Sequence, residues 1–171
     1  MSKTENIQLA EPYKTIILRL LDELLKFFGD KLVSLIVYGS VARGDYRKDS
    51  DIDLLVIIDG LPKSKFKRVE LFLEVEMKLD SLLNKLFNEG YAVTFSPVIK
   101  TPEEACRVSP LYLDMVEDAV IIYDKNDFFK KIIDKLRVNL KRLGAERVWI
   151  GNRWYWRLKK DYKFGEVINI E

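Results

Sequence analysis

Apolar residues recur at helical spacing in several segments of the chain and form short uninterrupted runs in others. The first helical pattern lies between Pro12 and Gly29, with apolar residues at Ile16, Ile17, Leu20, Leu21, Leu24, Leu25 and Phe28. Proline favours the first turn of a helix, and glycine favours the position after its last turn. The pattern therefore predicts an amphipathic helix between these two residues.

Similar spacing predicts three further helices. A long one should begin near Ser64, a candidate cap, and close at Gly90. The basic run at its start (Lys63, Lys65, Lys67 and Arg68) is more typical of a solvated helix start than of a surface facing a nucleotide or acceptor. A short helix is expected over residues 110–118. The last helix should run from Asp127, as its cap, to Gly144.

The uninterrupted apolar runs predict buried strands. One run covers Leu35 to Tyr38 and another Leu54 to Ile58. Two more strands are expected over residues 91–99 and 119–123, the latter at a sheet edge. This order of elements predicts an α/β (α+β) fold, with a small mixed β-sheet covered by helices on one side.

Composition narrows the class of protein. The 171 residues are 48% hydrophobic and carry a net charge of +2, which fits one globular domain, or a domain with an appendage, that has a mixed-sign surface. The absence of His excludes histidine catalysis and histidine zinc sites, and a single cysteine, Cys106, excludes an internal disulfide. We expect Cys106 to be a small apolar core residue. No apolar run reaches about 18 residues, so we expect no membrane contact and a cytoplasmic location.

Two acidic residues stand at the start of the second apolar run. Asp51 and Asp53 should point to one face of the strand and Ile52 to the other, because alternate strand residues share a face. Two carboxylates this close repel each other, so a cation should sit between them. An oxygen-only pair suits Mg²⁺, which proteins usually hold with one or two carboxylates plus substrate phosphates.

The turn before the polar loop offers donors for those phosphates. Gly39 lets backbone N–H groups approach an anion, and Ser40 adds a hydroxyl. If Ser40 opens a short helix, its N-terminus favours an anion, and Arg43 adds a positive charge. Alone, the Gly-Ser pair or the Asp-x-Asp pair would be read as an ordinary turn or a solvated strand end. Their combination favours a metal-bound polyphosphate.

This stretch resembles the minimal nucleotidyltransferases of the DNA polymerase β superfamily. The resemblance rests on Gly39-Ser40, ten intervening residues with Ala42-Arg43-Gly44 and Ser50, and then Asp51-x-Asp53 entering an apolar strand. It implies Asp51 and Asp53 as the catalytic, metal-binding residues, with one or two Mg²⁺ ions. Gly39, Ser40, Arg43 and Ser50 would bind the nucleotide. It further implies a nucleotidyltransferase core over residues 1–108 and a C-terminal helical and hairpin extension over 109–171.

Related enzymes often carry a third carboxylate on the strand expected over residues 91–99. This chain has Thr94 and Ser96 there, which offer hydroxyl groups but no base at neutral pH. The nearest acidic residues, Glu103 and Glu104, follow the strand. Two of the three expected carboxylates are therefore present.

The tail alternates aromatic and basic residues and predicts a hairpin around Gly151-Asn152. Its aromatic residues are Trp149, Trp154, Tyr155 and Trp156, interleaved with Arg147, Arg153, Arg157, Lys159 and Lys160. Three roles stay open: sealing the last helix against the body, binding a partner protein, and, least favoured, stacking nucleic-acid bases.

The predicted reaction is Mg²⁺-dependent transfer of a nucleoside monophosphate from an NTP, with ATP favoured, to an acceptor hydroxyl. The resemblance adds a setting, because many such proteins are encoded beside a HEPN-type ribonuclease and some act as its antitoxin by adenylylating it. The alternative is a catalytically weak or inactive antitoxin-type protein that binds its partner through the aromatic tail. Self-association to a homo-oligomer is left open.

Overall fold

A computed structural model describes residues 7–151 and 153–170. The α-helices are α1 (Tyr13–Phe28), α2 (Gly39–Arg43), α3 (Lys65–Glu76), α4 (Asp80–Asn88), α5 (Pro102–Ala105), α6 (Pro110–Asp118) and α7 (Phe128–Leu143). The strands are β1 (Leu32–Tyr38), β2 (Ile52–Ile58), β3 (Phe95–Lys100), β4 (Val120–Asp124), β5 (Glu146–Ile150) and β6 (Arg153–Arg157). Three 3₁₀ turns, η2 (Gly29–Lys31), η3 (Met77–Leu79) and η4 (Lys125–Asp127), connect them.

Four strands form a mixed sheet in the order β3-β2-β1-β4. Strand β1 runs antiparallel to both β2 and β4, whereas β2 and β3 are parallel. The predicted mixed sheet and the edge position of β4 are confirmed. Strand β3 begins at Phe95, later than predicted, because Ala92 N–H donates to the carbonyl of Lys48 (3.0 Å) and holds this segment on the preceding loop.

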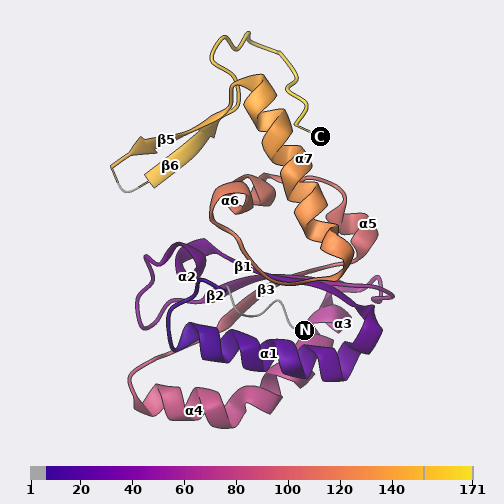
Figure 1. The fold of residues 1–171 in the computed structure, drawn as a ribbon, viewed down its shortest axis with the longest axis vertical. Helices are drawn as coiled ribbons and strands as arrows, with labels where there is room; N and C mark the ends of the chain where they lie inside the picture. The colour runs from indigo at the N-terminus through magenta and orange to yellow at the C-terminus, as the bar shows by residue number, and fades with distance from the viewer. Residues whose placement is uncertain (1–6, 152, 171) are drawn as a thin grey trace.

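Helices cover both faces of the sheet, so the prediction of helices on one side is wrong (Figure 1). Leu35, Val37, Leu54 and Val56 pack with α1, α3 and α4 on one face. Ile36, Leu55 and Ile57 pack with α6 and α7 on the other. The central strands β1 and β2 are therefore buried on both faces, which is why their sequences are apolar without alternation.

The ends of the helices agree only partly with the predicted caps. Gly29 and Gly144 end α1 and α7 as predicted, and the Ser64 hydroxyl accepts from Lys67 N–H (3.4 Å) at the start of α3. Asp127 has left-handed backbone dihedrals and does not cap α7 with its side chain. The carboxylate of Asp124 accepts from the N–H groups of Phe129 (3.0 Å) and Lys130 (2.9 Å) instead.

The long helix predicted from Ser64 to Gly90 is two helices joined by η3. The turn places Val75 and Leu79 in the core while Met77 stays 60% exposed. The expected core position of Cys106 is also wrong, because this cysteine is exposed. No helix in the described ranges is long and apolar enough to cross a membrane.

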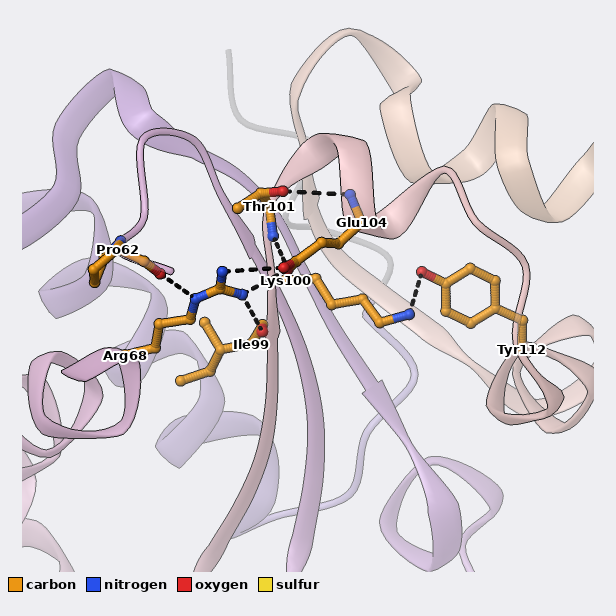
Figure 2. Close-up of polar contacts among 7 residues, drawn as sticks. All are labelled: Pro62, Arg68, Ile99, Lys100, Thr101, Glu104 and Tyr112. Carbon is orange, nitrogen blue, oxygen red and sulfur yellow. Dashed lines mark hydrogen bonds and ion pairs between the residues drawn. The ribbon is translucent and has the colours of Figure 1, made fainter. Parts of the chain in front are cut away.

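A buried arginine fixes α3 to the far end of β3 (Figure 2). Arg68 donates to both carboxylate oxygens of Glu104 (2.6 and 3.0 Å), to the carbonyl of Pro62 (2.6 Å) and to that of Ile99 (3.4 Å). Its side chain is 6% exposed. Because buried charges need several partners to offset their desolvation, this set of bonds holds α3, β3 and α5 in one arrangement.

Candidate active site

The stretch from Gly39 to Asp53 lies at one end of the sheet, where β1 leads into α2 and the polar loop leads back into β2. Asp53 is the second residue of β2 and pairs with Tyr38 of β1 and Ser96 of β3. Asp51 precedes β2 and is exposed, whereas Asp53 is half-buried. The two predicted catalytic carboxylates therefore lie at the edge of the molecule, with Asp53 set into the sheet.

Gly39 is required where the chain leaves β1. Its φ of +73° lies in the left-handed region, which side chains disfavour. A Cβ atom at this position would lie 3.0 Å from Cγ of Asp53 and closer still to its carboxylate oxygen Oδ2. The glycine thus allows the backbone of the Gly-Ser turn to touch the Asp53 carboxylate, as the predicted phosphate-and-metal site requires.

The electrostatics of the carboxylate pair favour a cation. Burial and the neighbouring charge of Asp51 raise the pKa of Asp53, while Arg43 and a hydrogen bond from Ser96 act in the opposite direction. Tyr38, also half-buried, has its pKa raised to about 12 by burial and by Asp53. A raised carboxylate pKa means that negative charge is incompletely compensated here. Hard oxygen ligands with excess negative charge are the donor set that Mg²⁺ prefers.

Two hydroxyl groups hold the carboxylates in place. Thr94 Oγ1 donates to Asp51 Oδ1, and Ser96 hydrogen-bonds to Asp53. Neither supplies a third carboxylate, and the described part of the chain contains no group of three or more His, Cys, Asp or Glu placed to hold a metal. Glu104 is bound by Arg68 at the opposite end of β3. Asp51 and Asp53 are therefore the two carboxylates at this end of the sheet that could hold a metal.

The predicted phosphate-binding residues occupy different positions around this pair. Gly39 and Ser40 form the first turn of α2, and Arg43 is its last residue, near enough to Asp53 for its charge to oppose the rise in the pKa of Asp53. Ser50 lies within the loop, where its hydroxyl accepts from Arg47 N–H (2.8 Å). Ser50 is thus engaged in shaping the loop, whereas Gly39 and Arg43 lie near Asp53.

One contact to this site comes from the far end of the sequence. The ring centre of Trp154, in β6, lies 4.7 Å from the guanidinium carbon of Arg43. The indole N–H of Trp154 donates to Asp114 of α6 (3.1 Å). Arg147 also lies over the ring (5.3 Å) and is paired with Asp118. The aromatic-basic alternation of the tail was visible in the sequence, but its pairing with Arg43 depends on tertiary packing.

The predicted hairpin is confirmed, with Asn152 outside the described residues. Strands β5 and β6 pair from Glu146 opposite Arg157 to Ile150 opposite Arg153. Along β6, Trp154 and Trp156 are half-buried toward the body, while Arg153, Tyr155 and Arg157 are exposed. The hairpin therefore has one face on the molecule and one face open to solvent.

Comparison with known proteins supports the chemistry that this geometry suggests. A family model described as a nucleotidyltransferase domain matches residues 17–147. A putative protein adenylyltransferase of Methanocaldococcus jannaschii is 30% identical over 145 residues, which are 81% of this chain and 92% of that protein. The protein adenylyltransferase MntA of Thermococcus cleftensis is 33% identical over 75 residues, 42% of this chain and 74% of that protein.

The similarity of this chain to solved structures is lower than its similarity to the archaeal relatives. A toxin–antitoxin crystal structure with AMP-PNP superposes with a TM-score of 0.44 at 19% identity, covering 73% of this chain and 90% of that one. A complex of a tri-AMPylated HEPN toxin with its MNT antitoxin from Shewanella oneidensis gives 0.38 at 17% identity, covering 76% and 87%. The family model and the first archaeal relative are the findings that decide the assignment. The chain belongs to the nucleotidyltransferase domain family and is a nucleotidyltransferase.

Proposed function

We propose that the protein transfers a nucleoside monophosphate from an NTP, with ATP favoured, to a hydroxyl group of a partner protein, with Mg²⁺ as the metal. The observation that carries this proposal is the contact of the Gly39 turn with the Asp53 carboxylate, beside Asp51. This contact would place the proposed phosphate-binding turn next to the proposed metal ligands. The names of the archaeal relatives, protein adenylyltransferases, support ATP and a protein acceptor.

The two carboxylates would hold the metal. A bound Mg²⁺ supplies positive charge to the phosphates and lowers the pKa of an attacking hydroxyl. Thr94 and Ser96 donate hydrogen bonds to the carboxylates, so they orient Asp51 and Asp53 rather than accept a proton from the acceptor. These hydroxyl groups would fix the direction in which the carboxylate oxygens point when the metal binds.

The turn into α2 would bind the phosphates. The first N–H groups of a helix have no partners within the helix, and Gly39 lets the Asp53 carboxylate lie close to this turn. Arg43 carries a guanidinium at the other end of the same turn. These groups would bind the β- and γ-phosphates and hold the α-phosphate next to the acceptor, which is the positioning that phosphoryl-group chemistry requires.

The acceptor we propose is a HEPN-type toxin, with this chain as its antitoxin. The solved neighbours include a HEPN toxin carrying AMP beside an MNT antitoxin, which makes this acceptor class the first to try. The non-catalytic alternative, partner binding through the tail alone, is not favoured, because the relatives are named for adenylyl transfer.

The experiment is to incubate the protein with ATP, Mg²⁺ and a purified HEPN-type partner and to measure the intact mass of the partner. Wild type should add whole AMP units and release pyrophosphate. The double variant Asp51→Asn/Asp53→Asn should add none while still forming the complex. AMP transfer by that variant would contradict the assignment of the carboxylates.

A further inference from the structure

Helix α3 and Met77, the first residue of η3, expose a row of large apolar side chains that no part of the described chain covers. Phe66 is 72% exposed, Val69 43%, Leu73 47% and Met77 60%. Their spacing of three, four and four residues puts them on one face of the helix. Scattered single apolar residues are common on protein surfaces, but a continuous row of four is typical of an interaction surface. We call these four residues the α3 stripe.

The stripe is not a face of α3 that should be buried in the core, because the opposite face of the helix is already packed and hydrogen-bonded there. Phe72 and Val75 are buried in the core, and Arg68 makes the hydrogen bonds to Glu104, Pro62 and Ile99 shown in Figure 2. Rotating α3 to bury the stripe would break these bonds and leave a buried charge without a partner. The stripe is therefore held toward solvent.

The stripe is also separate from the catalytic site. Asp53 pairs with Ser96 at the start of β3, whereas Arg68 binds beyond Ile99 at its end. Next to the stripe, a pocket of about 430 Å³ opens between Lys65 and Val69 of α3 and residues 97–100 of β3. This pocket extends the apolar surface available to whatever covers the stripe.

The charges beside the stripe are arranged so that it can pair with itself. The basic residues Lys65 and Lys67 lie at its N-terminal end, and the acidic residues Glu74 and Glu76 lie at its C-terminal end. In an antiparallel pairing, Lys65 of one copy would lie opposite Glu76 of the other, and Lys67 opposite Glu74. In this arrangement the apolar rows of the two copies would face each other, with Val69 near Leu73 and Phe66 near Met77 of the second copy. A parallel pairing would instead bring like charges together.

We propose that the α3 stripe is the interface of a homodimer in which two α3 helices pack antiparallel about a two-fold axis. Such an interface is self-complementary, because each residue contacts the symmetry-related patch of the second copy. The apolar row supplies the affinity, and the flanking charges set the orientation. This proposal does not depend on the identity of the acceptor or on catalysis.

Two charge-reversed variants test the proposal on the full-length chain. Lys65→Glu/Lys67→Glu makes both ends of the helix acidic, and Glu74→Lys/Glu76→Lys makes both ends basic. The solution mass is measured by light scattering after size exclusion, and circular dichroism checks folding. Wild type should be a dimer, and each variant alone should dissociate at least tenfold more readily. A mixture of the two should restore a one-to-one heterodimer, which native mass spectrometry distinguishes from either homodimer.

A second pair of variants tests the apolar row without altering charge. Phe66→Ser/Leu73→Ser should weaken the dimer at least tenfold, whereas Val138→Ser, on the 66% exposed side chain of α7, should leave it unchanged. A monomeric wild type would overturn the proposal. So would a dimer that survives both the charge reversal and the serine substitutions, or a mixture of the reversed variants that stays monomeric. If the serine variant loses only binding of a HEPN-type partner, the stripe belongs to that partner and not to a second copy.

Discussion

Trp154 packs its indole ring on the guanidinium of Arg43, 4.7 Å from ring centre to the guanidinium carbon. The contact joins β6, near the end of the chain, to α2, the turn proposed to bind phosphate. Trp154 is itself fixed by its hydrogen bond to Asp114. The hairpin thus restricts the position of Arg43, a cation near Asp53, one of the two carboxylates proposed to be catalytic.

We expect Trp154→Ala to weaken Mg²⁺-dependent ATP binding several-fold. A cation–π contact contributes about 0.5–2 kcal/mol, and its loss frees Arg43 to move away from the site. Calorimetric titration of ATP in the presence of Mg²⁺ measures the effect. Tyr155→Ala, on the exposed face of the same strand, is the matched control and should bind ATP like wild type. In an Arg43→Ala background the tryptophan substitution should add nothing further; additive losses would show that Trp154 acts by another route.

Gly39→Ala should abolish metal-dependent nucleotide binding. The new methyl group would collide with the Asp53 carboxylate, in addition to the strain of a left-handed residue, about 1 kcal/mol or more. Gly44→Ala separates the two effects, because Gly44 also has positive φ (+81°) but has no atom within 4 Å of an added Cβ. We expect Gly44→Ala to lower the melting temperature yet retain ATP binding. Equal binding losses in both variants would mean that backbone strain alone, and not contact with Asp53, is responsible.

Asp53→Asn should stabilise the metal-free protein at neutral pH while removing its function. Because the pKa of Asp53 is raised in the folded state, its ionisation costs stability as the pH rises above the usual range of an aspartate. The amide cannot ionise and avoids that cost. Thermal unfolding in EDTA should therefore show a higher midpoint for the variant at pH 7, and the difference should shrink as the pH falls toward the usual pKa of aspartate. Asp59→Asn, at an exposed aspartate outside the site, is the control.

Arg68→Ala should destabilise the fold by about 3 kcal/mol, because it removes a buried cation and leaves the Pro62 and Ile99 carbonyls without this donor. Glu104→Gln should cost less, since the glutamate is 44% exposed. The Arg68 hydrogen bonds lower the pKa of Glu104 to about 2. Its contribution is therefore present above the usual glutamate pKa and is lost as the pH falls from there toward 2. Chemical unfolding measured across this pH range should show the stability of wild type falling toward that of Glu104→Gln.

Much of the fold was predictable from local patterns. Interactions between residues close in the sequence determine three of the predicted features: the strands β1 and β2, the glycine after α1 and the hairpin at Gly151. Each of these predictions was confirmed. The Gly39 turn and the Asp51-x-Asp53 pair could be placed because turn and strand chemistry fix them within about 15 residues of one another.

The remaining features depend on contacts between distant segments. The second helical layer follows from where α6 and α7 pack, which the apolar runs of β1 and β2 permit but do not dictate. The cap of α7 comes from Asp124 because a left-handed turn at Asn126 and Asp127 brings that carboxylate back to the helix. The stacking of Trp154 on Arg43 joins residues 111 positions apart in the sequence, so no local sequence pattern predicts it.

The central claim is that Asp51 and Asp53 catalyse metal-dependent AMP transfer to a partner protein. The most direct measurement is the intact mass of a HEPN-type partner after incubation with ATP and Mg²⁺, with wild type and Asp51→Asn/Asp53→Asn side by side. The account predicts added AMP with wild type, none with the double variant, and none with wild type in EDTA. Equal AMP transfer by the double variant, or transfer in EDTA, would contradict it.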